Sequence, residues 1–460
     1  MTASGAAGQT TALVGATVID GTGKPAIPNA VVVVTGDRLS CVGTGAACPV
    51  PPGATRVSVA GRFVTPGLVD AHVHLSETGW FDGRPDLVDA PALHPYSETV
   101  RALRASQTRW FRADLCSGVT AVYDVGGHPW TTTLAARAER DAMAPRVRAA
   151  GPALTPRPRA ALRVDDSTYA DLPMSTPADV RAGVAALEAM GASAVTVRIG
   201  ADASSAQADL DARLSDIGAA ARMAGLDLIV ETSQLRVAKA ALRAGAIMLA
   251  HGVEDEPADD EFLTLVQTTR PFYAPTLLAD RDGVRALASI VLGTRYPLDD
   301  PGRCVDSATV AKTSAVAPLR LRIPDFAGAP ARVLRDLDAA EDRAAMLADN
   351  LRRVAAAGAT IVAGTDAGSP LVFHGASIGA ELEAMQAAGI PAADVVVMAT
   401  RNGARAMRRA KDFGTLEAGK LADLLVLAED PRNDVRAFRS LTHVMRGGTL
   451  HERAALAQRN

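Results

Sequence analysis

The chain has 460 residues, of which 48% are hydrophobic and 22% charged, and its 48 Lys and Arg against 51 Asp and Glu give a formal net charge of −3. An apolar content this high excludes a disordered protein. Near-neutral charge without a basic block leaves no electrostatic footprint for nucleic acid, and no stretch approaches the roughly 18 uninterrupted apolar residues of a membrane span. We therefore expect a soluble protein with a large core and with neither nucleic acid nor membrane as a partner.

The cysteines and the opening residues indicate a cytoplasmic protein. The first ten residues, MTASGAAGQT, lack the charged-then-apolar order of a secretory signal. Four cysteines in a chain of this size do not form a disulfide framework. Cys41 and Cys48 could pair, but we expect buried thiols.

The chain opens with strand-and-turn chemistry. Residues 13–19, 30–35 and 56–59 are short β-branched runs separated by Gly, Pro and Asn clusters. Residues 423–427 and 441–445 are strand-like again near the other end. We expect these β-rich ends to pair into one composite β-sandwich domain, formed by residues 1–62 and 414–460.

The middle of the chain, residues 63–413, alternates short apolar runs with helical patterns, which indicates βα units and a parallel sheet. One of the helices opens with Thr176 and Pro177 as cap and first position. Eight strands are predicted, at residues 67–71, 119–124, 146–150, 194–199, 227–230, 247–250, 272–275 and 360–364. The prediction is an α/β fold, a (β/α)8 TIM-type barrel with its chemistry at the carboxyl ends of the strands.

Two insertions interrupt this rhythm, at residues 78–98 and 277–339, after the first and the seventh strand. Both are rich in Pro, Gly, Asp and Arg and lie where lids belong. Plain surface decoration is an equally good interpretation of both.

His72 and His74 are the first candidates for chemistry. Residues i and i+2 of a strand share a face, so both imidazoles point the same way at the end of the first barrel strand. This arrangement suits a metal, although the pattern alone is short and two surface histidines would also produce it.

Three further polar residues end apolar strands: Glu231 the fifth, His251 the sixth and Asp366 the eighth. A barrel places catalytic residues at these positions. A loop-capping hydrogen bond explains any one of them, but the coincidence of these three with the His pair, five residues in all at strand ends, favours a site.

The chain resembles the amidohydrolase superfamily, in the branch similar to imidazolonepropionase and the prolidase-type metal-dependent hydrolases. The resemblance rests on VTPGLVDAHVHL at 64–75, GVTAVYDVG at 118–126, AGAIMLAHG at 244–252, GTDAG at 364–368, and GTLEAGKLADLLVL at 414–427. It implies the barrel and the composite β-sandwich. It also implies that His72, His74 and Asp366 bind a divalent metal, that Asp366 takes the proton from the attacking water, and that His251 completes a second metal site or steadies the substrate. Family habit suggests a homo-oligomer.

Two positions depart from the family pattern. The fifth-strand histidine ligand falls on Glu231, and the fourth-strand lysine, which bridges two metals when carboxylated, falls on Thr196. Threonine cannot form a carbamate, so we expect one metal, and two neutral imidazoles with two carboxylates suit a single Zn²⁺. Glu231 could be a ligand, which we prefer, or a proton shuttle, or the sign of a lost metal and a silent binding protein.

The substrate-binding candidates are Arg198, His128 and Tyr273. Arg198 shares the face of Thr196 and could hold a substrate carboxylate through two parallel hydrogen bonds, although a surface arginine at a strand end is as good an interpretation. His128 is more often structural than functional in such a position.

The sequence therefore predicts a metal-dependent hydrolase that cleaves a non-peptide carbon–nitrogen bond, in an amide, a cyclic amide or an amidine of a small molecule. The alternative is a non-hydrolytic enzyme of the same fold, acting by cyclisation, dehydration, isomerisation or decarboxylation on a specialised metabolite.

Overall fold

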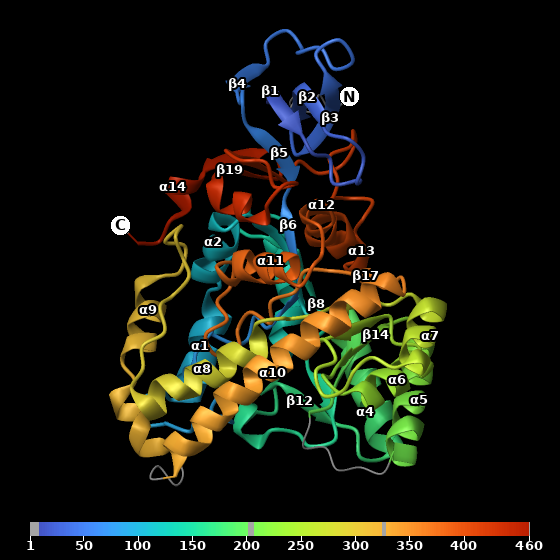
Figure 1. The fold of residues 1–460 in the computed structure, drawn as a ribbon, viewed down its shortest axis with the longest axis vertical. Coiled ribbons are helices and arrows are strands. Elements are labelled where there is room, and N and C mark those ends of the chain that lie inside the picture. Colours follow the sequence, from blue (N-terminus) through green and yellow to red (C-terminus); the bar gives the residue numbers. More distant parts are fainter. Residues whose placement is uncertain (1–8, 201–206, 324–327, 460) are drawn as a thin grey trace, which may run out of the picture.

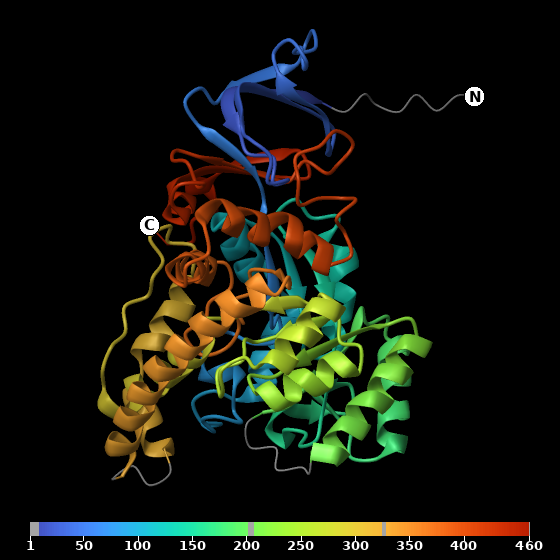
Figure 2. The ribbon, with the colours of Figure 1, turned by 45° about the vertical axis from the view of Figure 1, so that its right-hand side comes forward.

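The computed structural model describes residues 9–200, 207–323 and 328–459. Residues 1–8, most of the segment considered above for a secretory signal, lie outside this part of the chain. A sheet made from both ends of the sequence lies at one end of the molecule, and a ring of parallel strands wrapped by helices forms the rest (Figures 1 and 2). Among the described helices, none combines the length and the apolar composition needed to cross a membrane.

All eight predicted barrel strands are confirmed, with small shifts at their ends. They are β6 (Leu68–Val73), β7 (Val119–Asp124), β8 (Arg146–Ala149), β13 (Ala194–Arg198), β14 (Asp227–Glu231), β15 (Met248–Ala250), β16 (Phe272–Ala274) and β17 (Thr360–Ile361). Neighbouring strands pair in parallel. The ring closes where Ala71 N donates to Ala363 O at 2.9 Å and Ser193 N donates to Ala149 O at 2.9 Å.

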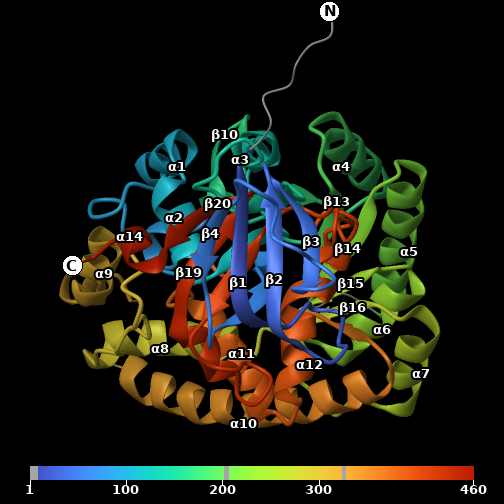
Figure 3. The same cartoon turned by 90° about the horizontal axis from the view of Figure 1, so that it is seen from above.

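Helices surround the ring, as the view from above shows (Figure 3). They are α1 (Tyr96–Ala105), α2 (Thr108–Cys116), α3 (Leu134–Ala138), α4 (Pro177–Ala189), α5 (Gln207–Met223), α6 (Leu235–Arg243), α7 (Asp260–Thr269), α8 (Ala279–Leu292), α9 (Ser307–Ser314), α10 (Ala329–Ala356), α11 (Ser377–Ala387), α12 (Ala392–Val397), α13 (Gly403–Ala406) and α14 (Arg453–Leu456). The predicted start of α4 is confirmed, because the Thr176 side chain accepts a hydrogen bond from Asp179 N at 3.1 Å and the Asp179 carboxylate accepts one from Thr176 N.

One elaboration was missed from the sequence. Between β8 and α4 the chain forms four short strands, β9 (Ala153–Thr155), β10 (Arg163–Asp165), β11 (Thr168–Tyr169) and β12 (Asp171–Pro173). Strands β9 and β12 pair with each other and extend the barrel sheet beyond β13. Runs of two or three residues are too short to show a period of two in the sequence.

The two ends of the sequence share one eight-stranded sheet. It contains β1 (Thr10–Val18), β2 (Ile27–Thr35), β3 (Arg38–Thr44), β4 (Thr55–Ser58), β5 (Phe63–Pro66), β18 (Leu424–Leu427), β19 (Leu441–Arg446) and β20 (Thr449–Glu452). β5 joins the halves, because it pairs with β1 on one side and with β18 on the other. Since β6 follows β5 directly, this sheet adjoins the amino end of the first barrel strand. The boundaries of the two expected domains stay a prediction.

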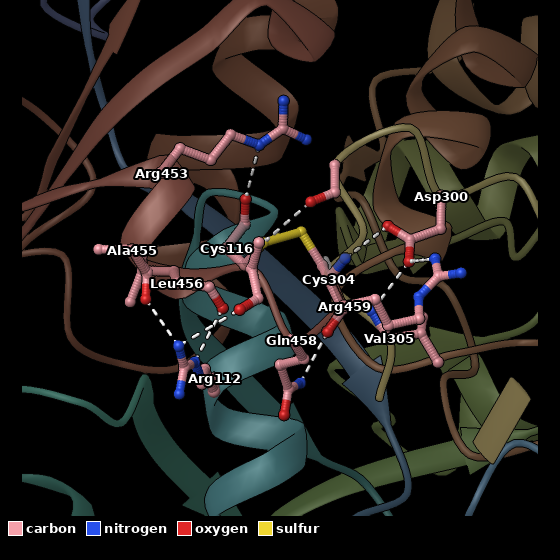
Figure 4. Close-up of a disulfide and its surroundings, with 12 residues drawn as sticks. Arg112, Cys116, Asp300, Cys304, Val305, Arg453, Ala455, Leu456, Gln458 and Arg459 are labelled. Atoms are coloured by element: carbon pink, nitrogen blue, oxygen red, sulfur yellow. Dashed lines mark hydrogen bonds and ion pairs between the residues drawn. A yellow bond between two sulfur atoms is a disulfide. The ribbon is translucent and has the colours of Figure 1, made fainter. Parts of the chain in front are cut away.

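The expectation of free thiols is wrong, because the described part of the chain contains no free cysteine. Cys41 is bonded to Cys48, and Cys116 to Cys304 across 188 residues. The second disulfide ties α2 to the insertion after β16 (Figure 4). The carboxy-terminal segment lies against it, where the Gln458 side chain donates to Cys304 O at 2.6 Å. Sequence spacing could not reveal this pair, since only the fold brings its halves together.

Candidate metal centre

His72 and His74 meet Asp366 at the carboxyl ends of the first and last barrel strands. The two Nε2 atoms lie 3.4 Å apart, and Asp366 Oδ1 is 3.3 Å from His72 Nε2 and 2.9 Å from His74 Nε2. All three residues are buried. Within the described residues, these three form the group whose ligand atoms are close enough to share one metal ion.

The hydrogen bonds of this group indicate a cation at its centre. His74 Nδ1 donates to the backbone carbonyl of Gly126 at 2.7 Å, because a carbonyl oxygen can only accept. The Nε2 atom of a neutral His74 ring then carries a lone pair, and this lone pair faces the carboxylate of Asp366. Two acceptors at 2.9 Å repel each other unless a proton or a metal ion lies between them. The backbone bond at Nδ1 is also how proteins orient a metal-binding histidine, so the donor set fits a divalent metal.

Asp366 is held in one orientation. Its backbone N donates to His72 O at 2.8 Å, and Ser369 Oγ donates to its Oδ2 at 2.7 Å. One carboxylate oxygen therefore faces the histidines, and the other faces Ser369. Ser369 lies three residues after Asp366 in a turn rich in small residues, and no sequence pattern marked it as part of the site.

His251 directly follows β15 and lies beside the group, with its ring centre 4.8 Å from that of His72. Thr276 Oγ1 donates to Pro275 O at 2.9 Å, so it accepts from His251 Nδ1, which is 2.7 Å away. This leaves a lone pair on Nε2 of the neutral ring. Burial and the neighbouring His72 lower the pKa of His251, which keeps the ring neutral. The geometry does not include His251 in the three-residue metal group.

Three residues of the site have left-handed backbone conformations: His251 at φ +98°, Thr276 at φ +45° and Asp366 at φ +65°. Such conformations cost about 1–3 kcal/mol each for residues other than glycine, and the cost is greater for a β-branched residue such as threonine. Strain of this kind clusters at functional sites. The fold thus holds these three residues in place at the expense of local stability.

Glu231 is not a member of the metal group, because its carboxylate is engaged elsewhere. It lies opposite Arg198 in the parallel register of β13 and β14, and the two form an ion pair through Arg198 Nε and Nη2, the latter 3.2 Å from Glu231 Oε1. Burial alone would raise the pKa of Glu231, but the charges of Arg198 and His74 lower it to about 2. Thr196, two residues before Arg198, is fully buried, and its hydroxyl has no hydrogen-bond partner in the described structure.

His74 carries the opposite shift. Burial alone would lower its pKa, but the hydrogen bond to Asp366 and the charges of Asp366 and Glu231 raise the pKa to about 9. Burial alone would raise the pKa of Asp366. Hydrogen bonds from His72 and His74 and the charges of these two rings instead hold it well below its usual range. The site therefore favours positive charge between these side chains, which a metal ion would also supply.

The other two substrate-binding candidates lie away from the cavity beside the metal group. His128 is buried, and its Nε2 bonds the hydroxyl of Tyr96 at 2.9 Å. Burial lowers its pKa to about 4, so the ring is neutral. Tyr273 is also fully buried, and its hydroxyl accepts a hydrogen bond from Val253 N at 2.8 Å. The structure thus does not bring His128 or Tyr273 to the cavity wall, since the His128 ring bonds Tyr96 and the Tyr273 hydroxyl bonds Val253 instead.

The cavity has a volume of about 500 Å³ and opens over the metal group. Both insertions line it, the first through Phe81, Arg84 and Leu87, and the second through α8. Its charged lining residues are Glu77, Arg84, Arg159, Arg198, Glu231, Glu254, Asp280 and Asp366. The two insertions therefore help to enclose the site and are more than surface decoration.

Comparison with known proteins agrees with this arrangement. The chain is 37% identical over 112 residues to the 5-methylthioadenosine/S-adenosylhomocysteine deaminase of Moorella thermoacetica, over 22% of this chain and 26% of that protein. It is 35% identical over 127 residues to the imidazolonepropionase of Streptomyces coelicolor, over 25% of this chain and 32% of that protein. The matched stretches thus span less than a third of these relatives.

The fold itself is shared over nearly the whole chain. A crystal structure of a Xaa-Pro dipeptidase with bound methionine in the active site has a TM-score of 0.70, at 21% sequence identity, over 96% of this chain and 100% of that one. At this identity the likeness concerns the fold alone. The sequence profile of the Amidohydrolase family matches residues 63–450, which include the barrel and the whole metal group. The chain therefore belongs to the amidohydrolase family.

Proposed function

We propose that this protein is a metal-dependent hydrolase that cleaves a carbon–nitrogen bond in a small molecule, in an amide, a cyclic amide or an amidine. The observation that carries the proposal is the convergence of His72, His74 and Asp366 beside a cavity of about 500 Å³. These three residues would hold the metal, and one Zn²⁺ suits their mixed nitrogen and oxygen donors.

A divalent cation at this place supplies Lewis acidity, which makes water a better nucleophile at neutral pH and polarises a carbonyl group. The residues of the chain do the rest. Asp366 takes the proton from the attacking water and passes it to the leaving nitrogen, while Ser369 holds its second oxygen in place. His251 lines the cavity with a neutral ring, and its Nε2 lone pair can accept a hydrogen bond from the substrate, which steadies the substrate beside the metal group.

Glu231 has a different part in this proposal from the one expected. It is a negative partner for Arg198 beside the metal group, and not a metal ligand. A single metal site remains consistent with Thr196 at the position where the family has its bridging lysine.

The named relatives support the reaction type. One is a deaminase and the other an imidazolonepropionase, and a deaminase breaks a carbon–nitrogen bond. Because the matched stretches are short, the reaction of this chain is argued from its own site. A homo-oligomer and a cytoplasmic location remain predictions, and the two disulfides weigh against a reducing compartment.

Two measurements test the proposal. Elemental analysis of protein purified without chelators should find about one equivalent of a divalent metal per chain, as expected for a tight site. Turnover in ¹⁸O-labelled water should place the label in the product. A metal-free protein contradicts the proposal, and so does a metal-dependent reaction whose product carries no label, since that would indicate a non-hydrolytic enzyme.

A further inference from the structure

Three arginines line one side of the cavity, Arg84 from the first insertion, Arg159 from the loop between β9 and β10, and Arg198 from the end of β13. We propose that this arginine wall (Arg84, Arg159 and Arg198) binds a carboxylate of the substrate. The hydrolysed compound is then an amide that carries a carboxylate close to the scissile bond, such as an N-acyl amino acid. The hydrolytic step of this inference rests on the proposed function, whereas the binding of the carboxylate does not.

Each arginine is fixed by one carboxylate. Arg84 donates to Asp86 from Nε at 2.9 Å and from Nη2 at 2.8 Å. Arg159 donates to Asp171 from the same two atoms, both at 2.7 Å. Arg198 holds Glu231 in the same way. The three planar groups are therefore oriented before any ligand arrives, which lowers the entropy lost on binding.

The remaining nitrogen of each guanidinium has weaker partners. Arg84 Nη1 is 3.5 Å from Glu77, Arg159 Nη1 is 3.6 Å from Asp86, and Arg198 Nη1 is 3.8 Å from Asp171. Hydrogen bonds from a charged nitrogen to a carboxylate are normally about 2.7–2.9 Å long. Each arginine therefore keeps donors that a ligand can use.

Two of the three carboxylates that fix the wall, those of Asp86 and Asp171, lie behind it, whereas Glu231 lines the cavity beside Arg198. Asp86 and Asp171 do not line the cavity, and their side chains are 11% and 2% exposed. The arginine side chains are 15–21% exposed and do line it. At Arg84 and Arg159 the cavity thus meets a guanidinium group in front and the carboxylate that fixes it at the back, which is the arrangement of a binding site for an anion.

The wall begins next to the metal group. A Cβ atom on Gly126 would lie 3.0 Å from Arg198 Nη2, 3.2 Å from Glu231 Oε1 and 3.5 Å from His74 Cε1, so these three side chains meet around one glycine. A carboxylate on Arg198 is consequently only a few bonds from an amide carbonyl that lies beside His74. This short span suits the α-carboxylate of an amino acid.

The charge of the wall favours a carboxylate over a phosphate. Three guanidiniums are surrounded by four carboxylates, Glu77, Asp86, Asp171 and Glu231. A dianionic phosphate meets more repulsion from these carboxylates than a singly charged group does. The planar carboxylate also matches the donors of a guanidinium.

The test measures binding to the metal-loaded protein by calorimetry, with hippurate (N-benzoylglycine) and its uncharged amide, hippuramide, as probes. Wild-type protein should bind hippurate about 10–100-fold more tightly, as expected for hydrogen bonds between charged groups. R159Q should lose most of this preference while the metal content and the affinity for hippuramide stay unchanged. Arg159 pairs with Asp86 and Asp171 and not with the metal group. A loss of the preference in R159Q would therefore show that hippurate binds to the arginine wall and not to the metal alone.

R408Q is the matched control, because Arg408 holds Asp227 through Nε and Nη2 outside the cavity, and it should keep the full preference. If R159Q does not fold, R159Q/D171N removes the buried pair together and should show the same loss. Equal affinity for the two probes in the wild type, or a preference that survives in R159Q or in R159Q/D171N, overturns the inference. Neither result bears on metal content or hydrolysis, so a failure of the proposed function is recognised separately by elemental analysis.

Discussion

Arg198 and Glu231 lie directly opposite each other on β13 and β14, and their ion pair occupies the place beside His74 where a fifth-strand metal ligand was expected. The guanidinium of Arg198 thus places a positive charge next to the metal group. Because the carboxylate of Glu231 is paired with Arg198, this relationship argues against Glu231 as a metal ligand, the interpretation preferred from the sequence.

The first prediction concerns the role of Glu231. E231Q should keep the metal content of the wild type, because Glu231 is outside the metal group, and should lose about 10–100-fold in kcat/KM, as is usual when a residue that supports a metal site is replaced. Elemental analysis and kinetics on the same preparation measure both effects. A loss of the metal from E231Q would show that Glu231 is a ligand after all.

The second prediction concerns His74. H74N should lose most of the bound metal, because it removes one of three ligands, and with it the turnover. Its fold should persist, since the His74 side chain has one hydrogen bond outside the metal group, to Gly126 O. Circular dichroism provides the control for folding. Full metal occupancy in folded H74N would mean that the metal binds elsewhere.

Asp366 is the subject of the third prediction. D366N should lower kcat by about 10²–10⁴-fold, the usual contribution of a general acid–base group, while the two histidines keep the metal bound at millimolar added Zn²⁺. S369A provides a milder comparison, because it removes the hydrogen bond that orients Asp366 Oδ2. D366N with wild-type turnover would refute the proposed proton transfer.

Strand periodicity placed His72, His74 and Asp366 at one mouth of the barrel, and the resemblance to the amidohydrolase superfamily singled out these three as metal ligands. His72 and His74 share a face, and parallel strands in a closed ring place their carboxyl ends at one mouth, so Asp366 had to lie near them. The partner of Glu231 was harder to predict, because pairing with Arg198 depends on the register between two strands. Arg159 lies in an elaboration without a clear period, and nothing in the sequence connects it to the cavity.

The cysteines illustrate a second limit. Cys116 and Cys304 are 188 residues apart, and the insertion that carries Cys304 has no periodic pattern to place it. The expectation of free thiols used the number and spacing of the cysteines, which describe only local pairs such as Cys41 and Cys48. Long-range pairs follow from the fold.

The fourth prediction follows from that disulfide. The chain-entropy estimate assigns about 5 kcal/mol of stability to a cross-link that closes a loop of 188 residues and about 2 kcal/mol to one that closes a loop of 7. C116S/C304S should therefore lower the free energy of unfolding more than C41S/C48S does. Denaturant titration without reductant compares the two variants. An equal loss in both would show that the long cross-link does not restrain the unfolded chain as the estimate assumes.

The fifth prediction uses a buried carboxyl behind the site. Glu381 on α11 is 1% exposed, and its Oε1 accepts a hydrogen bond from Leu277 N at 3.0 Å. Its Oε2 has no hydrogen-bond partner among the described residues. Burial raises the pKa of Glu381 to about 8. Because the folded pKa lies above the unfolded one, the carboxyl contributes stability below about pH 4.5, and this contribution is lost as the pH rises towards 8.

E381Q, which is neutral at every pH, should therefore become more stable relative to the wild type as the pH rises from 5 to 8, by on the order of 3 kcal/mol. Burying the amide of E381Q costs the same free energy at each pH. The result is therefore the slope of the stability difference between E381Q and the wild type against pH. E383Q is the matched control on the same helix, since Glu383 pairs with Arg439 and is more exposed. The stability of E383Q relative to the wild type should not increase between pH 5 and pH 8. Denaturant unfolding at pH 5, 6, 7 and 8 measures these slopes. Parallel curves for E381Q and the wild type would mean that Glu381 is ionised in the folded protein, with water or a rearranged donor at Oε2.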